Sequence, residues 1–301
     1  QIGPMLQRLY ASQNLDGGWG WWANEASSPL LTAYVLYGLA EAKGSGFIVD
    51  QSVIDQAVSY LYSQLKAEPK DESDPKDVQA AVLYALAQAD QGDLGRTVQL
   101  YQNREDLSLH AKAYLAMTLQ DLAPEQTERL TTLSDELAGA AILSATGAHW
   151  EEAEYSAWTM GTDTRTTAMV LRALVQIDPD ASVLPNAVRW LTIVRENGRW
   201  ETTQENVWAI LSLTDYMVST GELEADYEYL LAGNGDQQAD ASGSANTLDQ
   251  PVSTLVPMSD LKFGENNLVL MQRKPADAAG RLYYSIFLDY YLPIEEMPAR
   301  D

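Results

Sequence analysis

Small and apolar residues recur at positions i, i+3, i+4 and i+7 in five segments that carry few charges. This spacing predicts helices that are buried on most sides. The five segments begin at Leu30, Asp77, Leu109, Arg165 and Gln204. Between them lie segments with a one-sided apolar stripe, which begin at Ser52, Gly95, Thr127 and Leu184. The alternation, at a repeat of roughly 40 residues, predicts an inner ring of apolar helices inside an outer ring of amphipathic ones.

The expected fold class is therefore mainly α. We predict an α/α toroid of helix pairs, as a closed or an incomplete ring, or an α-solenoid if the ring does not close. Local signals agree with the expected helix at Leu30. Ser27-Ser28-Pro29 predicts its start, because Ser caps helices and Pro is favoured in the first turn. Gly44-Ser45-Gly46 predicts its end.

The pattern changes after Gly221. Asn234-Gly235 predicts a tight hairpin, and residues 237–251 are expected to form a polar loop. Residues 252–274 are expected to form two strands joined by a turn at Lys262–Asn266, and residues 280–293 a long strand rich in aromatic and β-branched side chains. So few strands predict a part of a β domain. We expect a helical domain over residues 1–223 and a β-rich partial domain over residues 224–301.

Composition narrows the classes of partner. The 301 residues include 43 acidic and 19 basic residues, for a net charge of -24. Nucleic acid is therefore not an expected partner, because phosphate binding needs clustered Lys and Arg. The chain has no cysteine, which excludes disulfides, thiolate nucleophiles and Cys-ligated zinc. No apolar run approaches the roughly 18 residues of a membrane span, so no membrane insertion is expected.

The chain begins with Gln rather than Met and has no leader pattern. We therefore expect a mature product or an excised fragment of a longer protein.

Residues 13–22, QNLDGGWGWW, combine three tryptophans with glycines. Gln13, Gly17 and Trp19 match Q-x-x-x-G-x-W, which resembles the repeat of terpene cyclases, where glutamine and tryptophan tie adjacent helices together. Residues 195–200, RENGRW, echo it with Gly198 and Trp200 but without the glutamine. We expect a structural loop at a helix-pair junction, made by Gln13, Gly17, Gly18, Trp19, Trp21 and Trp22. A carbohydrate or isoprenoid platform built from Trp21 and Trp22 is the alternative.

Other groups of polar residues allow an enzyme as the alternative function. Toroidal glycoside hydrolases and lyases use paired carboxylates on the rim. Here Asp16, Glu151, Glu154, Asp163 and Glu205 are the candidates for such a pair.

No metal site or cofactor is expected. His149 lies near Glu151, Glu152 and Glu154, but its surroundings do not match H-E-x-x-H, so a polar loop between helices is the preferred interpretation. His110 lies within a predicted helix and is interpreted as structural. Residues 161–167, GTDTRTT, have threonines where a terpene cyclase would need more carboxylates.

Several phrases together resemble one family. Residues 13–42, QNLDGGWGWW followed by SSPLLTAYVLYGLAEA after a short gap, are similar to the thioester-containing helical domain of bacterial alpha-2-macroglobulins. Residues 149–174 and 189–213 resemble later parts of that domain. Residues 280–293 resemble a strand of the adjoining CUB-like β domain. The resemblance therefore extends along essentially the whole chain.

The resemblance implies a broad-spectrum protease inhibitor rather than an enzyme. In the family a protease cuts a bait region, the inhibitor collapses, and the protease is trapped. An internal Cys-Gln thioester acylates the protease in many members. The resemblance thus makes the loop of Gln13, Gly17, Gly18, Trp19, Trp21 and Trp22 a candidate for a thioester-proximal loop, as the alternative to a purely structural one. The implied partners are target proteases and the other domains of the same parent chain, and the implied location is the cell envelope, periplasmic or extracellular.

This chain departs from the family pattern in two ways. It has no cysteine, so the Cys-x-Glu-Gln motif is expected upstream of Gln1, unless the chain comes from a thioester-less scaffold member. The stretch from Trp21 to Ser28 also lacks the histidine that some relatives use to accept the acyl group.

Overall fold

The computed structural model describes residues 2–22, 25–66, 75–153, 160–222, 226–244, 252–274, 284 and 286–288. The chain divides into two compact units, a helical unit over Gln1–Tyr216 and a β unit over Met217–Asp301. In the described ranges the helices are α1 (Ile2–Ala11), α2 (Pro29–Gly44), α3 (Gln51–Gln64), α4 (Pro75–Gln88), α5 (Leu94–Gln102), α6 (Leu109–Leu122), α7 (Thr127–Gly139), α8 (Asp163–Ile177), α9 (Leu184–Ile193) and α10 (Thr203–Ser219). The strands are β1 (Ile142–Ser144), β2 (Gly147–His149), β3 (Asp226–Gly233), β4 (Asp236–Ser244) and β5 (Leu268–Arg273).

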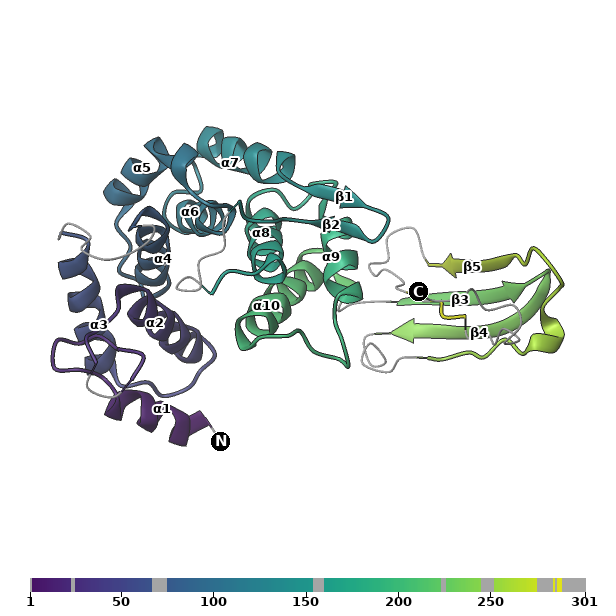
Figure 1. Cartoon of the computed structure of the whole chain (residues 1–301), viewed down its shortest axis with the longest axis horizontal. Helices are drawn as coiled ribbons and strands as arrows, with labels where there is room; N and C mark the ends of the chain where they lie inside the picture. The colour runs from purple at the N-terminus through teal and green to yellow at the C-terminus, as the bar shows by residue number, and fades with distance from the viewer. Residues whose placement is uncertain are drawn as a thin grey trace, which may run out of the picture. The chain divides into compact units, whose positions relative to one another are not determined.

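The helical unit has an inner and an outer layer of helices (Figure 1). The inner layer consists of α2, α4, α6, α8 and α10, and α1, α3, α5, α7 and α9 lie around it. Inner helices pack on one another in chain order, α2 on α4, α4 on α6 and α6 on α8. The mainly α fold class predicted from the sequence is confirmed, and the five segments predicted to be buried are the five inner helices.

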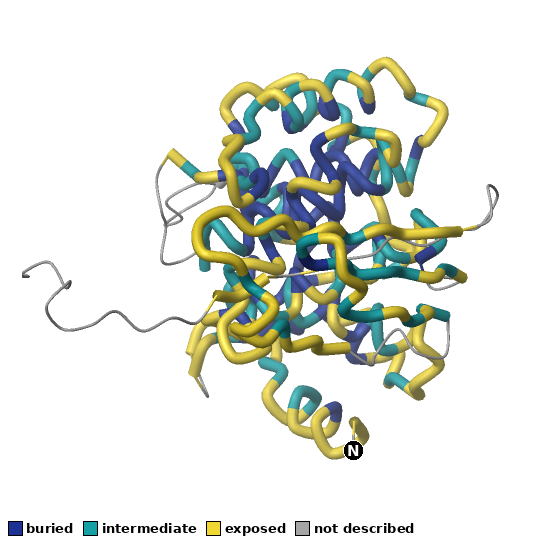
Figure 2. Tube along the Cα trace, turned by 90° about the vertical axis from the view of Figure 1, so that its right-hand side faces the viewer, coloured by how far each residue is buried: buried dark blue, intermediate teal, exposed yellow. Residues whose placement is uncertain are grey.

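Burial separates the two layers (Figure 2). In the inner helix α8, every residue from 165 to 175 is buried. The outer helix α7 instead buries one side, with Leu130, Leu133 and Leu137 at the i, i+3 and i+7 positions. This is the difference that the apolar patterns predicted, because an enclosed helix needs apolar residues on every face and an outer helix on one face only.

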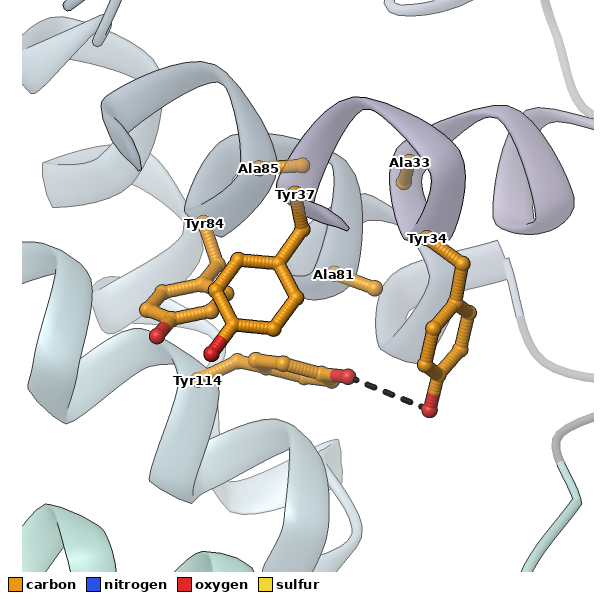
Figure 3. Close-up of a pocket in the computed structure, with 7 residues that line it drawn as sticks. All are labelled: Ala33, Tyr34, Tyr37, Ala81, Tyr84, Ala85 and Tyr114. Carbon is orange, nitrogen blue, oxygen red and sulfur yellow. Dashed lines mark hydrogen bonds between the residues drawn. The ribbon is translucent and has the colours of Figure 1, made fainter. Parts of the chain in front are cut away.

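Aromatic rings fill the centre of the inner layer (Figure 3). Tyr37 of α2 stacks on Trp208 of α10 with ring centroids 5.7 Å apart. Tyr84 of α4 lies 5.3 Å from Tyr37 and 5.1 Å from Tyr114 of α6. The cavity beside these rings is about 10 Å³, which is about the space that one water molecule requires. The rings therefore link the last inner helix back to the first and leave too little space for an organic ligand.

Local signals at the ends of α2 act as the sequence predicted. Ser28 Oγ accepts a hydrogen bond from the backbone N–H of Leu31 at 3.3 Å, and Pro29 is the first helical residue. The helix ends at Gly44, and Gly46 adopts φ +84° directly after it. Of the helices in the described part of the chain, none combines the length and the apolar character that a membrane span requires.

The β unit contains an antiparallel sheet with the strand order β4-β3-β5. Asn234 and Gly235 adopt φ values of +54° and +100° between β3 and β4. Positive φ at both positions is what the predicted two-residue hairpin requires, and Asn-Gly adopts it at low cost. The register between β3 and β4 shifts between Leu231 and Ala232, which indicates a bulge next to this turn.

Two predictions for the β unit are wrong. Residues 237–244 were expected to be a loop but belong to β4, because the hairpin turn holds them in register with β3 in spite of their polar side chains. Residues 252–261 were expected to be a strand but contain only a 3-10 turn at Met258–Asp260. Pro257 lies in this segment and has no N–H to donate to a strand ladder.

The sequence patterns also missed α1 and the hairpin of β1 and β2. The predicted strand over residues 280–293 lies largely outside the described residues; residue 284 and residues 286–288 are described and have no regular structure. The two compact units meet at Tyr216, within α10, whereas the sequence analysis placed the boundary after residue 223. The identities assigned to the two domains stay predictions.

Truncation of Trp208 tests the role of the ring centre. We expect Trp208→Ala to lower the free energy of unfolding of the helical unit by about 3–5 kcal/mol, because it leaves a cavity among packed rings. Val207→Ala is the matched control, since Val207 is the preceding residue of α10 and is 43% exposed. Urea denaturation followed by far-UV circular dichroism measures both. Equal losses for the two variants would contradict the central role of Trp208.

Candidate functional site

The loop from Gln13 to Trp22 connects α1 to α2 and is fastened to α3. Gln13 Nε2 donates hydrogen bonds to the carbonyl oxygens of Gly17 at 2.9 Å and of Val53 in α3 at 3.0 Å. Gly17 adopts φ +91°, and a Cβ at this position would lie 2.4 Å from the carbonyl oxygen of Gln56 in α3. A side chain at position 17 would therefore separate the loop from α3.

Polar side chains fix the shape of the same loop. Asp16 Oδ1 accepts hydrogen bonds from the Gly18 N–H at 3.0 Å and from Ser27 Oγ at 2.7 Å. Asn14 Nδ2 donates to Ser27 Oγ and to the carbonyl oxygen of Glu25, both at 2.9 Å. A Cβ on Gly18 would lie 2.5 Å from Cβ of Ser27. These contacts make Asp16 and Gly18 parts of a folded turn.

Trp19 joins the end of α1 to the start of α2. Its indole Nε1–H donates to the carbonyl oxygen of Leu9 at 2.9 Å, and its backbone N–H donates to Thr32 Oγ1 at 3.0 Å. Leu9 lies in the last turn of α1, where carbonyl groups have no partner within the helix. Thr32 lies in the first turn of α2. The side chain of Trp19 is buried, so its ring adds apolar contact to these two hydrogen bonds.

Trp150 repeats this arrangement between α7 and α8. Its indole Nε1–H donates to the carbonyl oxygen of Leu137 at 2.7 Å, and its backbone N–H donates to Thr167 Oγ1 at 3.0 Å. Gly147 precedes it with φ +133°, and a Cβ there would lie 2.3 Å from the carbonyl oxygen of Asn186 in α9. Gly17 and Gly147 thus each allow the loop to lie against the backbone of the next outer helix.

Trp200 provides the third example, between α9 and α10. Its indole Nε1–H donates to the carbonyl oxygen of Leu191 at 3.0 Å, and its backbone N–H donates to Asn206 Oδ1 at 3.1 Å. Asn206 Nδ2 in turn donates to the carbonyl oxygen of Trp200 at 2.7 Å. We call this arrangement of indole, outer-helix carbonyl and inner-helix side chain a tryptophan bracket.

The three tryptophan brackets share one geometry. In each, the accepting carbonyl belongs to a leucine two residues before the last residue of the outer helix. The sequence analysis placed Trp19 and Trp200 at helix junctions but did not include Trp150. The signal for Trp150 was a glycine three residues upstream and a threonine at the start of the following apolar helix, without the glutamine that marked the first loop.

Trp21 and Trp22 differ from the bracket tryptophans. Trp21 is 43% exposed and Trp22 is 78% exposed, and Leu15 of the same loop is fully exposed. The backbone N–H of Trp22 donates to Glu25 Oε2 at 3.1 Å. The structure thus divides the predicted site residues into a buried group that joins helices and an exposed pair of indoles.

A buried cluster of charged groups joins the starts of the inner helices α4 and α6. Glu152 accepts hydrogen bonds from the backbone N–H groups of Leu109 and His110, both at 3.0 Å, and contacts His110 Nδ1 at 2.9 Å. Asp77 accepts from the Ser108 N–H at 3.1 Å and lies 3.7 Å from His110 Nε2. Both carboxylates therefore bind amide groups at or just before the first turn of α6, which a helix leaves unpaired.

The hydrogen bonds of this cluster hold Glu152 in its charged form. Burial acts to raise the pKa of Glu152, but hydrogen bonds from His110 and from the amide groups of Leu109 and His110 outweigh it and leave the pKa below its usual value. The cluster can thus stabilise the ring without taking part in chemistry.

The carboxylates considered for a rim site lie in different local settings. Asp16 belongs to the turn described above, and Glu205 is buried and accepts a backbone N–H in the cap of α10. Glu151 pairs with His149 at 3.0 Å, and Asp163 lies in the first turn of α8. Glu154 lies outside the described residues. None of the described four lines the cavity at the ring centre.

Both histidines of the chain have protein partners. His110 belongs to the charged cluster, and His149 stacks on Trp190 of α9 with ring centroids 4.8 Å apart. Among the described residues, no group of three His, Cys, Asp or Glu is placed to hold a metal ion.

Comparisons with known proteins agree on one relationship. No protein-family model matches the chain. An alpha-2-macroglobulin of Thermotoga maritima is 39% identical over 56 residues, which are 19% of this chain and 4% of that protein. An alpha-2-macroglobulin homolog of Nostoc is 24% identical over an alignment that covers 97% of this chain and 15% of that protein. The chain therefore spans a small part of the length of the relatives it matches.

Solved structures show the same fold. The Escherichia coli alpha-2-macroglobulin, in a structure from domain MG7 to the C-terminus, matches 90% of this chain and 38% of that chain with a TM-score of 0.57 and 15% identity. Salmonella alpha-2-macroglobulin reacted with methylamine matches 80% of this chain and 16% of that chain with a TM-score of 0.59 and 19% identity. The resemblance to bacterial alpha-2-macroglobulins that the sequence motifs indicated is thus confirmed.

Removal of one indole N–H tests the tryptophan bracket. We expect Trp150→Phe to lower the free energy of unfolding by about 1 kcal/mol, because the carbonyl of Leu137 loses its shorter hydrogen bond and keeps only that of the Ala140 N–H at 3.3 Å, while an aromatic ring remains. Trp22→Phe is the matched control and should change it by less than about 0.5 kcal/mol. Urea denaturation measures both. A Trp150→Phe variant as stable as Trp22→Phe would refute the bracket.

Acid titration tests the charged cluster. The folded-state pKa of Glu152 lies below its unfolded value of 4.5, so its contribution to stability is complete above pH 4.5 and is lost as the pH falls through the folded-state pKa. Unfolding free energies measured between about pH 6 and pH 3 should therefore fall less steeply for Glu152→Gln than for the wild type. Glu125→Gln, at an exposed loop position, should keep the wild-type slope. Parallel slopes for Glu152→Gln and the wild type would show that the cluster does not stabilise the fold.

Proposed function

We propose that this chain is a segment of a bacterial alpha-2-macroglobulin-like protein that inhibits proteases of broad specificity by trapping them. In this proposal, residues 1–223 form the helical domain that houses or shields a thioester. Residues 224–301 form part of the adjoining CUB-like domain. The chain itself catalyses no reaction.

The proposal is carried by one combined observation. The chain matches alpha-2-macroglobulins along nearly its whole length, and its bracket tryptophans Trp19, Trp150 and Trp200 are buried inside helix junctions. A carbohydrate-active enzyme would instead need indoles along a solvent-filled cleft with two carboxylates nearby. The buried indoles therefore favour a mechanical role for the ring over the enzyme alternative.

Closely packed helix junctions would allow the helical unit to move as a rigid body. Each tryptophan bracket fixes an outer helix to the following inner helix by two hydrogen bonds and a buried ring, and packed elements of this kind shift as rigid parts. In the proposed mechanism, a protease cuts a bait region elsewhere in the parent protein. The helical unit is then displaced during the collapse that encloses the protease.

The thioester is proposed to lie elsewhere in the parent protein. The chain contains no cysteine and so cannot form a Cys–Gln thioester by itself. We assign the loop of Gln13 to Trp22 to the surface near the thioester, because its indoles Trp21 and Trp22 are the exposed members of the motif. Exposed aromatic side chains of this kind suit contact with another domain.

The proposed partners are target proteases and the other domains of the parent protein. The proposed location is the cell envelope, periplasmic or extracellular, where foreign proteases reach the cell. Related Escherichia coli structures are described as activated by porcine elastase and by trypsin, which supports proteases as partners.

A protease-trapping assay on the parent protein tests the proposed function. After incubation with porcine elastase, we expect the cleavage of a large protein substrate to fall at least tenfold while the cleavage of a small peptide substrate is retained. A trapped protease is shielded from large molecules but keeps its active site. Parent protein pretreated with irreversibly inactivated elastase is the control. Its bait region stays uncut, so it should still protect the large substrate from fresh elastase. Undiminished cleavage of the large substrate would contradict the proposal.

Treatment of the parent protein with methylamine distinguishes a parent that contains a thioester from one that lacks it. Release of one free thiol per parent chain would indicate a thioester and predicts covalent conjugation of the protease. Protease trapping without a released thiol would indicate the thioester-less scaffold, which acts by steric enclosure.

A further inference from the structure

Arg165 is a buried cation that has no carboxylate partner among the described residues. It lies in the first turn of α8 and is 1% exposed. Its Nε donates to the hydroxyl of Tyr34 at 3.1 Å, and its Nη2 lies 3.4 Å from the hydroxyl of Tyr114. Its Nη1 is buried and has no hydrogen-bond partner. Within the described residues, no carboxylate lies within ion-pair distance of this guanidinium.

Arg172, the second buried arginine of α8, forms ion pairs with carboxylates. It lies two turns further along the same side of α8 and is 8% exposed. Its Nε donates to Asp215 Oδ2 at 2.8 Å, and its Nη2 lies 3.7 Å from Glu41 Oε1. Both arginines lie on one side of one helix and contact tyrosine hydroxyls, but among the described residues only Arg172 also has carboxylate partners.

Tyr114 does not supply a negative charge to Arg165. Burial raises the pKa of Tyr114 well above its ordinary value, so its hydroxyl stays protonated and neutral. Tyr114 donates to the hydroxyl of Tyr34 at 3.5 Å, and Figure 3 shows these two hydroxyl groups pointing toward one another. The oxygen of Tyr34 accepts from both neighbours, which leaves its own O–H available as a donor.

Two donors at this position therefore have no acceptor among the described residues. They are the Nη1–H groups of Arg165 and the O–H of Tyr34. Burial of an unpaired guanidinium is unfavourable, and the planar fork of arginine matches a carboxylate in geometry. Tyr34 is half-buried and its ring covers the guanidinium, with Arg165 Cζ 5.8 Å from the ring centroid.

We propose that Arg165 and Tyr34 form a binding site for a carboxylate at the N-terminal end of α8. The carboxylate comes from an acidic side chain of another part of the parent protein or from a small free carboxylate. In either case it completes the charge balance that Asp215 and Glu41 provide for Arg172.

Acetate is the probe for the free chain of 301 residues. We expect sodium acetate, compared with sodium chloride at equal ionic strength, to raise the Tm of the wild-type chain. At ten times Kd the rise should be about 3–6 °C for a unit of this size. In Arg165→Met, which keeps the bulk but not the charge, the rise should disappear. Without acetate, the Tm of Arg165→Met should equal or exceed that of the wild type, because an uncompensated buried charge is removed.

Arg172→Met is the matched control. It should lower the Tm, because it leaves Asp215 and Glu41 without their cation, but it should keep the response to acetate. Tyr34→Phe removes one of the two donors and should reduce the rise in Tm with acetate without abolishing it. This variant tests the site even if Arg165→Met does not fold. Acetate responses of equal size in the wild type, Arg165→Met and Tyr34→Phe would overturn the proposal.

The same Tm measurements on the parent protein distinguish a carboxylate side chain of the parent from a free carboxylate as the ligand. If a side chain of the parent occupies the site, acetate should no longer raise the Tm of the parent, and Arg165→Met should lower it. If a free carboxylate is the ligand, the parent should respond to acetate as the isolated chain does. The proposal is wrong if acetate has no effect on the isolated chain and Arg165→Met does not lower the Tm of the parent.

Discussion

The last carbonyl groups of an α-helix have no partner within the helix, and in a ring of packed helices those ends are shut away from water. In this protein an indole N–H satisfies such a carbonyl at three junctions, from Trp19, Trp150 and Trp200. The same tryptophan donates its backbone N–H to the first turns of the next inner helix. One residue thereby ends one helix and positions the next, and the arrangement of the two layers depends on it.

The rest of the helical unit follows from this constraint. The bracket of Trp150 holds the segment that carries Glu152 two residues later, and Glu152 binds the first amide groups of α6 while it contacts His110. Further along the inner helices, aromatic rings such as Tyr37 and Trp208 close the centre. Arg165 is one of several residues with a buried polar atom that has no hydrogen-bond partner, and as a buried cation it is the one for which we propose an external ligand. A stiff ring of this kind suits a protein that works by moving whole domains.

The apolar patterns predicted the five inner helices because an enclosed helix must be apolar on every side, a property that is local to its own sequence. The signal around Trp19 was also local, since Gln13 and Gly17 mark it. Trp150 was missed because its loop lacks the upstream glutamine that marks the loop of Trp19, and its partners Leu137 and Thr167 are too distant in sequence to form a short motif. The cluster of Asp77, His110 and Glu152 is brought together from distant segments by the ring. For β4, the hairpin at Asn234 outweighed the polar side chains that predicted a loop.

Hydrogen exchange of the indole N–H groups tests the tryptophan brackets most directly. Proton–nitrogen NMR spectra of the ¹⁵N-labelled chain resolve these groups separately from the backbone. The account predicts that the indole N–H groups of the three bracket tryptophans exchange only as slowly as the helical unit unfolds, whereas that of Trp22 exchanges within the dead time. Exchange of the bracket indoles at the rate of Trp22 would show that the junctions open freely, and the account of the ring would be wrong.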